Sequence, residues 1–150
     1  MEQNNIKVGI TLGDPNGVGA ETIVKIFRDS RMLDMATYVL YGSSKSLSFY
    51  KPTVEGGEQV SFNVVRSAAE AKGKKLNLVE CGAGDVRITA GEATSEGGAV
   101  AVESLRRAVA DVKEGTIDVL VTAPIMMSFS SCSPMGNKSH FLTFLRLHSM

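Results

Sequence analysis

Short apolar segments separated by turns and amphipathic stretches divide the first 125 residues of the chain. Apolar Val8, Ile10 and Leu12 alternate with smaller or polar residues, which predicts an interior β-strand over residues 6–12. The same patterns predict strands over 36–41, 60–65, 76–79 and 117–121, a short edge strand over 86–88, and helices over 20–30, 44–50 and 68–72. Together they predict an α/β domain with three α/β/α layers and a mostly parallel sheet.

The clearest helix lies between Ser95, the expected N-cap, and Gly115, the expected left-handed C-cap. Four apolar residues recur at intervals of three and four and predict its buried face, with Ala99 and Ala108 beside them: Val102, Leu105, Val109 and Val112. The strand that follows, 117–121, is expected to be buried.

A glycine-rich loop joins the first strand to the first helix. Its residues Gly13, Asp14, Gly17 and Gly19 make a candidate cleft loop, because amide groups at a helix N-terminus can hold an anion. A tight corner without a ligand explains the glycines equally well. The dinucleotide fingerprint and the nucleotide triphosphatase loop are both absent, since no third glycine and no Gly-Lys-Ser/Thr follows at the required spacing.

The strand over 117–121 ends in Thr122-Ala123-Pro124. Open α/β sheets bind ligands outside the carboxyl ends of their strands. If both strands are parallel, the sequence predicts that Asp14, Thr122 and the glycine loop face one crevice.

Composition limits the classes of partner and the cellular location that we expect for the chain. Apolar residues make up 43% of the chain, charged residues 21%, and the net charge is zero, which favours neither nucleic acid nor a membrane as partner. The amino terminus carries no secretory pattern, so we expect a cytoplasmic protein. Cys81 and Cys132 lie far apart and predict no disulfide, and His140 and His148 have no metal-binding spacing, so we predict no metal site in this chain.

The string GITLGDPNGVGAE, residues 9–21, resembles the amino-terminal signature of the 4-hydroxythreonine-4-phosphate dehydrogenases of vitamin B6 biosynthesis. Residues 118–125 resemble the family's strand and Thr-Ala-Pro turn, and Gly91-Glu92 and Gly97-Gly98-Ala99 fit between them. The resemblance covers about residues 5–125. It implies one lobe of an isopropylmalate-dehydrogenase-like fold, incomplete here.

For full-length members the resemblance implies a homodimer that oxidises 4-phosphooxy-threonine with NAD and a divalent metal, followed by decarboxylation, on the route to pyridoxal phosphate. We expect the 150-residue chain to lack the NAD and metal portions, to bind neither cofactor alone, to be inactive, and to associate or aggregate. Two alternatives stay open: a dehydrogenase fragment for another phosphorylated four-carbon acid, and a non-catalytic α/β binding domain.

Residues 126–150 depart from this pattern, with no Asp or Glu but six serines and four methionines. We expect an atypical, poorly ordered tail, and we hypothesise a frameshift or an erroneous gene end. An intact gene frame encoding the tail, with no family-like frame downstream, would contradict that hypothesis. By the resemblance His140 and Thr122 are candidate substrate-binding residues. The neighbours of His140 do not match the family pattern, and a coincidental position is the competing explanation.

Overall fold

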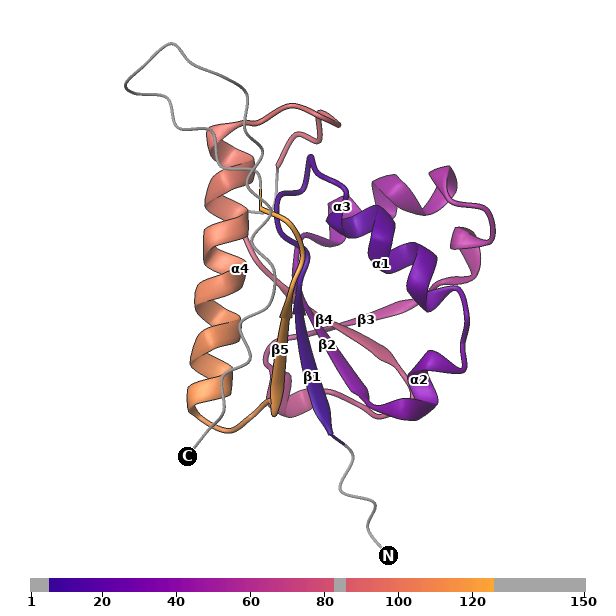
Figure 1. Cartoon of the computed structure of the whole chain (residues 1–150), viewed down its shortest axis with the longest axis vertical. Coiled ribbons are helices and arrows are strands. Elements are labelled where there is room, and N and C mark those ends of the chain that lie inside the picture. The colour runs from indigo at the N-terminus through magenta and orange to yellow at the C-terminus, as the bar shows by residue number, and fades with distance from the viewer. Residues whose placement is uncertain (1–5, 83–85, 126–150) are drawn as a thin grey trace, which may run out of the picture.

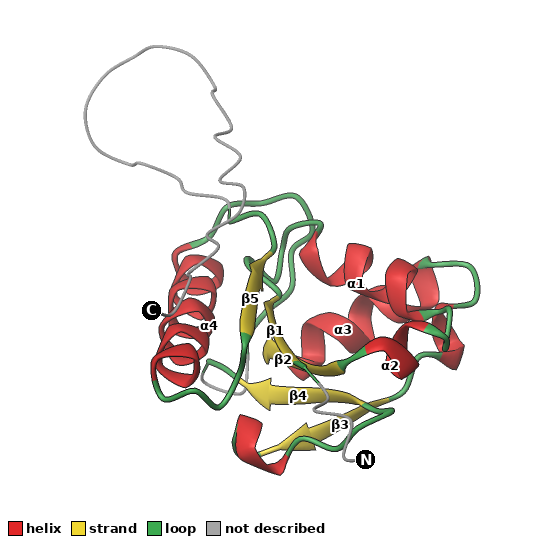
Figure 2. Cartoon of the chain, turned by 60° about the horizontal axis from the view of Figure 1, so that its bottom comes forward, coloured by secondary structure: helices red, strands yellow, loops and turns green. Residues whose placement is uncertain are grey.

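A parallel β-sheet with helices on both faces forms the part of the chain that the computed structural model describes, residues 6–82 and 86–125 (Figures 1 and 2). Its strands are β1 (Lys7–Thr11), β2 (Thr37–Gly42), β3 (Phe62–Val65), β4 (Leu76–Glu80) and β5 (Val119–Thr122). Its α-helices are α1 (Gly19–Phe27), α2 (Met32–Met35), α3 (Ser44–Tyr50) and α4 (Ser95–Lys113). Single 3₁₀ turns are η1 (Lys51–Thr53), η2 (Gly57–Gln59) and η3 (Ala68–Glu70). None of the helices within these ranges has the length and apolar character needed to span a bilayer.

The strands lie in the order β3-β4-β2-β1-β5, and each neighbouring pair is parallel. β1 has a partner on both sides, which confirms the prediction of an interior strand. Thr11 at its end pairs with Tyr41 of β2 and with Thr122 of β5. The carboxyl ends of these three strands therefore meet at one edge of the sheet.

Side chains of β2 alternate between the two faces of the sheet, and all its residues are buried. Tyr38 and Leu40 join the apolar cluster that includes residues of α1 and α3, whereas Val39 and Tyr41 join the cluster that includes Ala108 of α4. Figure 2 shows α4 on one side of the sheet and α1 and α3 on the other. The predicted three-layer α/β/α architecture is confirmed, and burial on both faces explains why β2 is an uninterrupted apolar run.

The predicted buried face of α4 is confirmed in part. Ala108 is buried, and Leu105, Val109 and Val112 pack against the core cluster that contains it, but Val102 is 55% exposed. The fully buried residues of the helix are Gly97, Val100, Ala101, Ser104 and Ala108. Small residues let the helix lie close to the sheet, so the tightest contact falls on them and not on the largest apolar side chains. The N-cap is Thr94, whose Oγ1 accepts a hydrogen bond from the Gly97 amide, and not Ser95. Gly115 has φ +73° after the last turn, as predicted.

Other boundaries also differ. The predicted edge strand over 86–88 is wrong, because this segment forms no strand and its continuation bonds to Asn16. The predicted helix over 68–72 is only the turn η3, and α1 ends at Phe27 before the expected Ser30. β5 is less buried than expected, since it pairs with β1 alone among the described strands.

Two substitutions on α4 test its corrected orientation. We expect Ala108→Leu to lower the free energy of unfolding by about 1–3 kcal/mol, because Ala108 is fully buried and a larger side chain overpacks the core. Val102→Ala should change it by less than about 0.5 kcal/mol, since Val102 is exposed. Urea denaturation of both variants measures the difference. A larger loss of stability for Val102→Ala than for Ala108→Leu would show that Val102 lies on the buried face.

Candidate functional site

A topological switch point lies between β1 and β5. These neighbouring strands connect to opposite faces: β1 continues into α1 on one side, and β5 follows α4 from the other. In open α/β sheets, the crevice beside such a point is the usual ligand site. Both sequence motifs are placed here, the glycine loop after β1 and the Thr-Ala-Pro turn after β5 (Figure 1).

The two loops touch through their backbones. Gly13 has φ +70°, and a Cβ built on it would lie 2.5 Å from the carbonyl oxygen of Pro124. The amide of Ala123 donates to the carbonyl oxygen of Thr11 over 3.0 Å. Thr122 is partly exposed at the end of β5, beside Thr11. The structure thus brings Gly13 and the turn that contains Thr122 together, as the parallel arrangement predicts.

Gly19 allows a second close approach. A Cβ at this first residue of α1 would lie 2.0 Å from the carbonyl oxygen of Leu12. Gly17 has a different role, because its amide closes a turn by donating to the carbonyl oxygen of Asp14 over 2.9 Å. Of the three loop glycines only Gly13 has a positive φ. Gly13 and Gly19 are therefore explained by packing, without any ligand.

Asp14 is buried, only 1% exposed, so its side chain does not open onto a crevice as the sequence predicted. Its Oδ1 accepts a hydrogen bond from the Asn16 amide over 2.8 Å, and a Cβ on Gly97 would lie 2.5 Å from the same oxygen. Its Oδ2 has no hydrogen-bond partner among the described residues. Burial raises the pKa of this carboxyl, and the Asn16 amide offsets part of that rise.

Asn16 joins the loop to a segment more than 70 residues later in the chain. Its side-chain amide donates to the Glu92 carbonyl oxygen over 3.0 Å and to Thr94 Oγ1 over 3.1 Å, and its Oδ1 accepts from the Thr89 amide over 2.8 Å. Sequence reasoning did not single out this residue. Only its place in the Gly-Asp-Pro-Asn-Gly string pointed to it.

Anion binding by the loop receives little support from these contacts. The Asn16 amide is bonded to the Asp14 carboxylate, and the Gly17 amide to the Asp14 backbone carbonyl oxygen. The carboxylate therefore takes the role of an anion at one of these two amides. Val18, the N-cap residue of α1, makes no side-chain capping bond, so its side chain does not engage the first-turn amides of the helix.

Metal-binding chemistry does not fit the described residues. Within 6–82 and 86–125, no group of three His, Cys, Asp or Glu side chains could hold a metal ion. Cys81 is a buried free thiol, and burial raises its pKa, which disfavours the metal-binding thiolate. Cys132, His140 and His148 lie outside the described residues, so the prediction for His140 remains a prediction.

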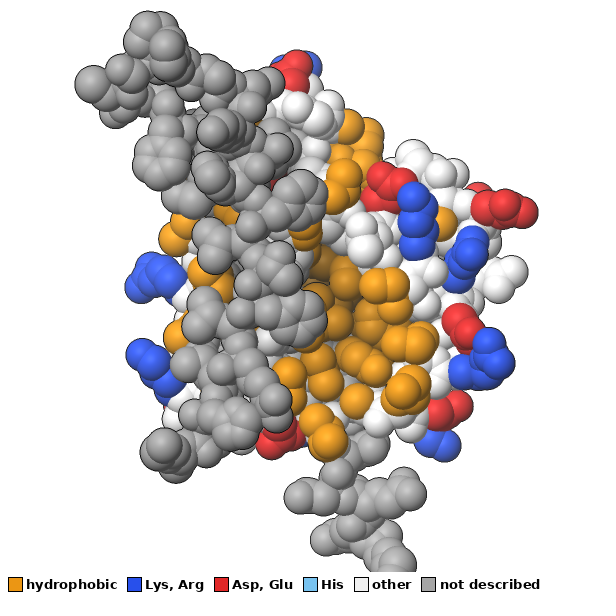
Figure 3. Space-filling model, viewed as in Figure 1, with side chains coloured by type: hydrophobic (Ala, Val, Ile, Leu, Met, Phe, Trp, Pro, Cys, Tyr) orange, Lys and Arg blue, Asp and Glu red, His pale blue; other side chains and the backbone are white. Residues whose placement is uncertain are grey.

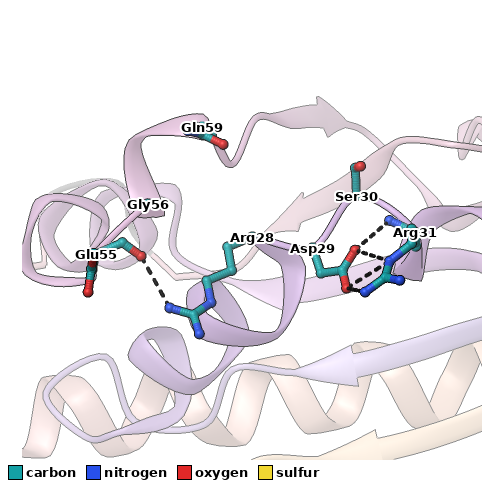
Figure 4. A pocket seen from close by; sticks show the side chains of 7 residues that line it. All are labelled: Arg28, Asp29, Ser30, Arg31, Glu55, Gly56 and Gln59. Carbon is teal, nitrogen blue, oxygen red and sulfur yellow. Dashed lines mark hydrogen bonds and ion pairs between the residues drawn. The ribbon is translucent and has the colours of Figure 1, made fainter.

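An open surface hollow lies at the far end of α1 from the glycine loop (Figure 4). Arg28 donates to the Glu55 carbonyl oxygen, and Arg31 pairs with Asp29 at 2.6 Å. Since the two arginines and the two acidic residues Asp29 and Glu55 balance in charge, this hollow has no net charge that would attract a phosphate.

Comparisons with known proteins identify the family. The sequence profile of the pyridoxal phosphate biosynthetic protein PdxA matches residues 34–140, most of the chain. The chain belongs to the PdxA family. It is 41% identical over 125 residues to a 4-hydroxythreonine-4-phosphate dehydrogenase of Bacteroides thetaiotaomicron, covering 83% of this chain and 34% of that protein. It is also 30% identical over 121 residues to an Oceanobacillus iheyensis protein that is named as a candidate D-threonate 4-phosphate dehydrogenase. That match covers 79% of this chain and 36% of the relative.

The fold of PdxA relatives agrees with this assignment. The crystal structure of a 4-hydroxythreonine-4-phosphate dehydrogenase from Burkholderia phymatum superposes with a TM-score of 0.74 at 28% identity, covering 83% of this chain and 38% of that one. The chain thus spans roughly a third of the length of the PdxA relatives that it matches. The profile match begins after the glycine loop, includes part of the segment 126–150 and ends at His140.

The PdxA glycine loop yields a stability prediction. Gly19→Ala should lower the free energy of unfolding by about 1–3 kcal/mol, because the new methyl group collides with the Leu12 carbonyl oxygen. Gly98→Ala is the matched control in α4, where nothing lies within 4 Å, and should stabilise by up to about 1 kcal/mol. Equal destabilisation by both variants, measured by urea denaturation, would contradict the packing role of Gly19.

Asp14 predicts a pH dependence. Because its pKa is raised above 3.8 in the folded protein, the folded state holds the proton more tightly than the unfolded chain. Its contribution to stability is then greatest below 3.8, falls as pH rises through the raised pKa, and is constant above it. We expect Asp14→Asn to remove this fall. The urea midpoints of the variant and of the unmodified protein, measured between pH 3.5 and 8, should then differ by an amount that grows as pH rises.

Asp29→Asn is the control with the opposite sign. Hydrogen bonds from Arg31 lower the pKa of Asp29 to about 2, so its contribution is present above 3.8 and is lost as pH falls toward 2. This variant should match the unmodified protein in slope across the range tested, apart from its acidic end. A flat difference for Asp14→Asn would show that the carboxyl is not shifted.

Proposed function

We propose that the chain is the amino-terminal lobe of a dehydrogenase that oxidises 4-phosphooxy-threonine, with the glycine loop and Thr122 lining the substrate cleft. The observation that carries the proposal is the juxtaposition of the two family motifs at the switch point, where Thr11 and Thr122 are register partners. The 41% identity to the Bacteroides thetaiotaomicron dehydrogenase supports the choice of substrate.

In this proposal Asp14 and Asn16 are positioning residues. The side chain of Asn16 holds the glycine loop against the 89–97 segment through its hydrogen bonds to Thr89 and Glu92. The partial exposure of Thr122 supports its role as the residue that faces a ligand. His140 is a further proposed substrate contact.

NAD and a divalent metal belong to the proposal for the full-length enzyme. A Lewis acid would stabilise the oxyanion that develops during oxidation and decarboxylation. The described residues offer no ligand set for that ion, so we assign no role in that chemistry to this lobe. A homodimer and a cytoplasmic location complete the proposal.

A second candidate is oxidation of D-threonate 4-phosphate. The Oceanobacillus iheyensis relative favours it, at a lower identity of 30%. Both substrates are phosphorylated four-carbon acids, so the lobe alone does not separate them.

Two chimeras test the function. Residues 1–125 of this chain replace the matched segment of the Bacteroides thetaiotaomicron dehydrogenase in one and of the Oceanobacillus iheyensis protein in the other. We expect the first chimera to reduce NAD with 4-phosphooxy-threonine at a kcat/KM within about tenfold of its parent, a loss of up to about 1.4 kcal/mol of transition-state stabilisation. The 150-residue chain alone should give no turnover.

The chimeras also discriminate the two substrates. Each is compared with its own parent, and the lobe is assigned to the substrate whose chimera keeps the larger share of parental activity. A folded first chimera without turnover, beside an active parent, would reject the proposal. Turnover by the 150-residue chain alone would reject the expectation that it is inactive.

A further inference from the structure

The outer edge of β3 is unpaired, because β3 ends the sheet and bonds only to β4 among the described strands (Figure 2). Charged side chains of both signs lie along the border of the face that Figure 3 shows, with apolar side chains in its middle. Charges at sheet edges usually protect a domain from association. Residues 61–65, Ser-Phe-Asn-Val-Val, carry neither a charge nor a proline, and Val64 is 56% exposed. This edge can therefore accept another strand.

Opposite charges stand on the two sides of this uncharged segment. Glu58 precedes Phe62 by four residues, Arg66 follows Phe62 by four, and both charged residues are exposed. Neither side chain forms an ion pair with another described residue. The backbone amide of Arg66 donates to Glu70 Oε2 over 3.2 Å, a bond that does not engage the guanidinium. Both charges are therefore available to a second molecule.

An antiparallel pair of β3 strands from two copies would satisfy both charges at once. About a twofold axis, the start of one strand lies beside the end of the other. With Phe62 at the axis, Glu58 of each copy faces Arg66 of the other copy. Parallel pairing would instead bring like charges together, which is destabilising. Strands pair in the plane of the sheet, so Lys51 can keep its place over the Phe62 ring, with its Nζ 5.8 Å from the ring centroid.

We propose that two copies of this chain associate through β3, as an antiparallel continuation of the sheet held by two Glu58–Arg66 ion pairs. The charges select the occupant, because an edge with opposite charges at its two ends is complementary to a second copy of itself. β3 has only four residues, so few backbone hydrogen bonds form between the copies and the dimer is weak. The contact uses this lobe alone and needs no catalytic activity.

Sedimentation velocity of the full 150-residue chain over a range of concentrations tests the contact. We expect a monomer–dimer equilibrium that weakens as sodium chloride rises from about 50 mM to about 0.5 M, because salt screens exposed charge pairs. Glu58→Lys should raise the dimer dissociation constant about tenfold, since two ion pairs become like-charge contacts, and Arg66→Glu should do the same. The double variant Glu58→Lys/Arg66→Glu makes the charges opposite again and should restore the dimer.

Val119→Asp is the matched control. Val119 is 45% exposed on β5, at the opposite edge of the described sheet, so a charge there should leave the β3 dimer unchanged. Thermal melts verify that every variant folds. A chain that stays monomeric at its highest soluble concentration, a dimer insensitive to Glu58→Lys, or a double variant that does not restore the dimer overturns the proposal. Association that Val119→Asp removes assigns the contact to β5 and also overturns it.

Discussion

Close backbone contact at the carboxyl end of β1 is the constraint on which the rest of the structure depends. Gly13 lies against Pro124 and Gly19 against Leu12, so the first helix and the end of β5 are both fixed relative to one strand. Neither position has room for a Cβ, and the opposing atoms are backbone oxygens that cannot rotate away. The arrangement of the switch point therefore follows from the absence of two side chains, and it exists before any ligand is present.

Buried polar groups in and beside the loop add to this arrangement, but some of them lower the stability of the folded state. Asn16 is well satisfied, since both its side-chain oxygen and its nitrogen are bonded. Asp14 is not, because one of its oxygens is buried without a partner among residues 6–82 and 86–125, as is the hydroxyl of Thr11. Burying an incompletely bonded polar group destabilises a protein by about 1–3 kcal/mol. A corner built only for stability would avoid that cost, so these two groups support the proposal that the switch point is a functional region.

Local patterns predicted the elements but not the contacts between them. β2 and the Gly115 cap follow from hydrophobic period and backbone preference, which are properties of neighbouring residues. The buried face of α4 was predicted only in part: Ala108 is buried as the period indicates, but close approach to the sheet favours Gly97 over Val102, and spacing alone does not reveal that. Likewise the segment after residue 86 reads as a strand in isolation. Its backbone instead bonds to Asn16, a partner that no local pattern reveals.

The contacts of the family motif are thus better explained by packing between segments of the chain than by anion binding. The carboxylate of Asp14 already occupies the amide of Asn16, and the backbone carbonyl oxygen of Asp14 occupies the amide of Gly17, so a phosphate at the Asn16 amide would have to displace a buried carboxylate. Such displacement is unfavourable unless Asp14 is protonated, a state that burial of its carboxyl promotes. Under the proposed function, a phosphorylated substrate would reach the exposed side of the switch point near Thr122, with its phosphate held by residues outside the loop. In that proposal the glycine loop fixes the position of the cleft through its packing against β1 and β5, and it supplies no group to the chemistry.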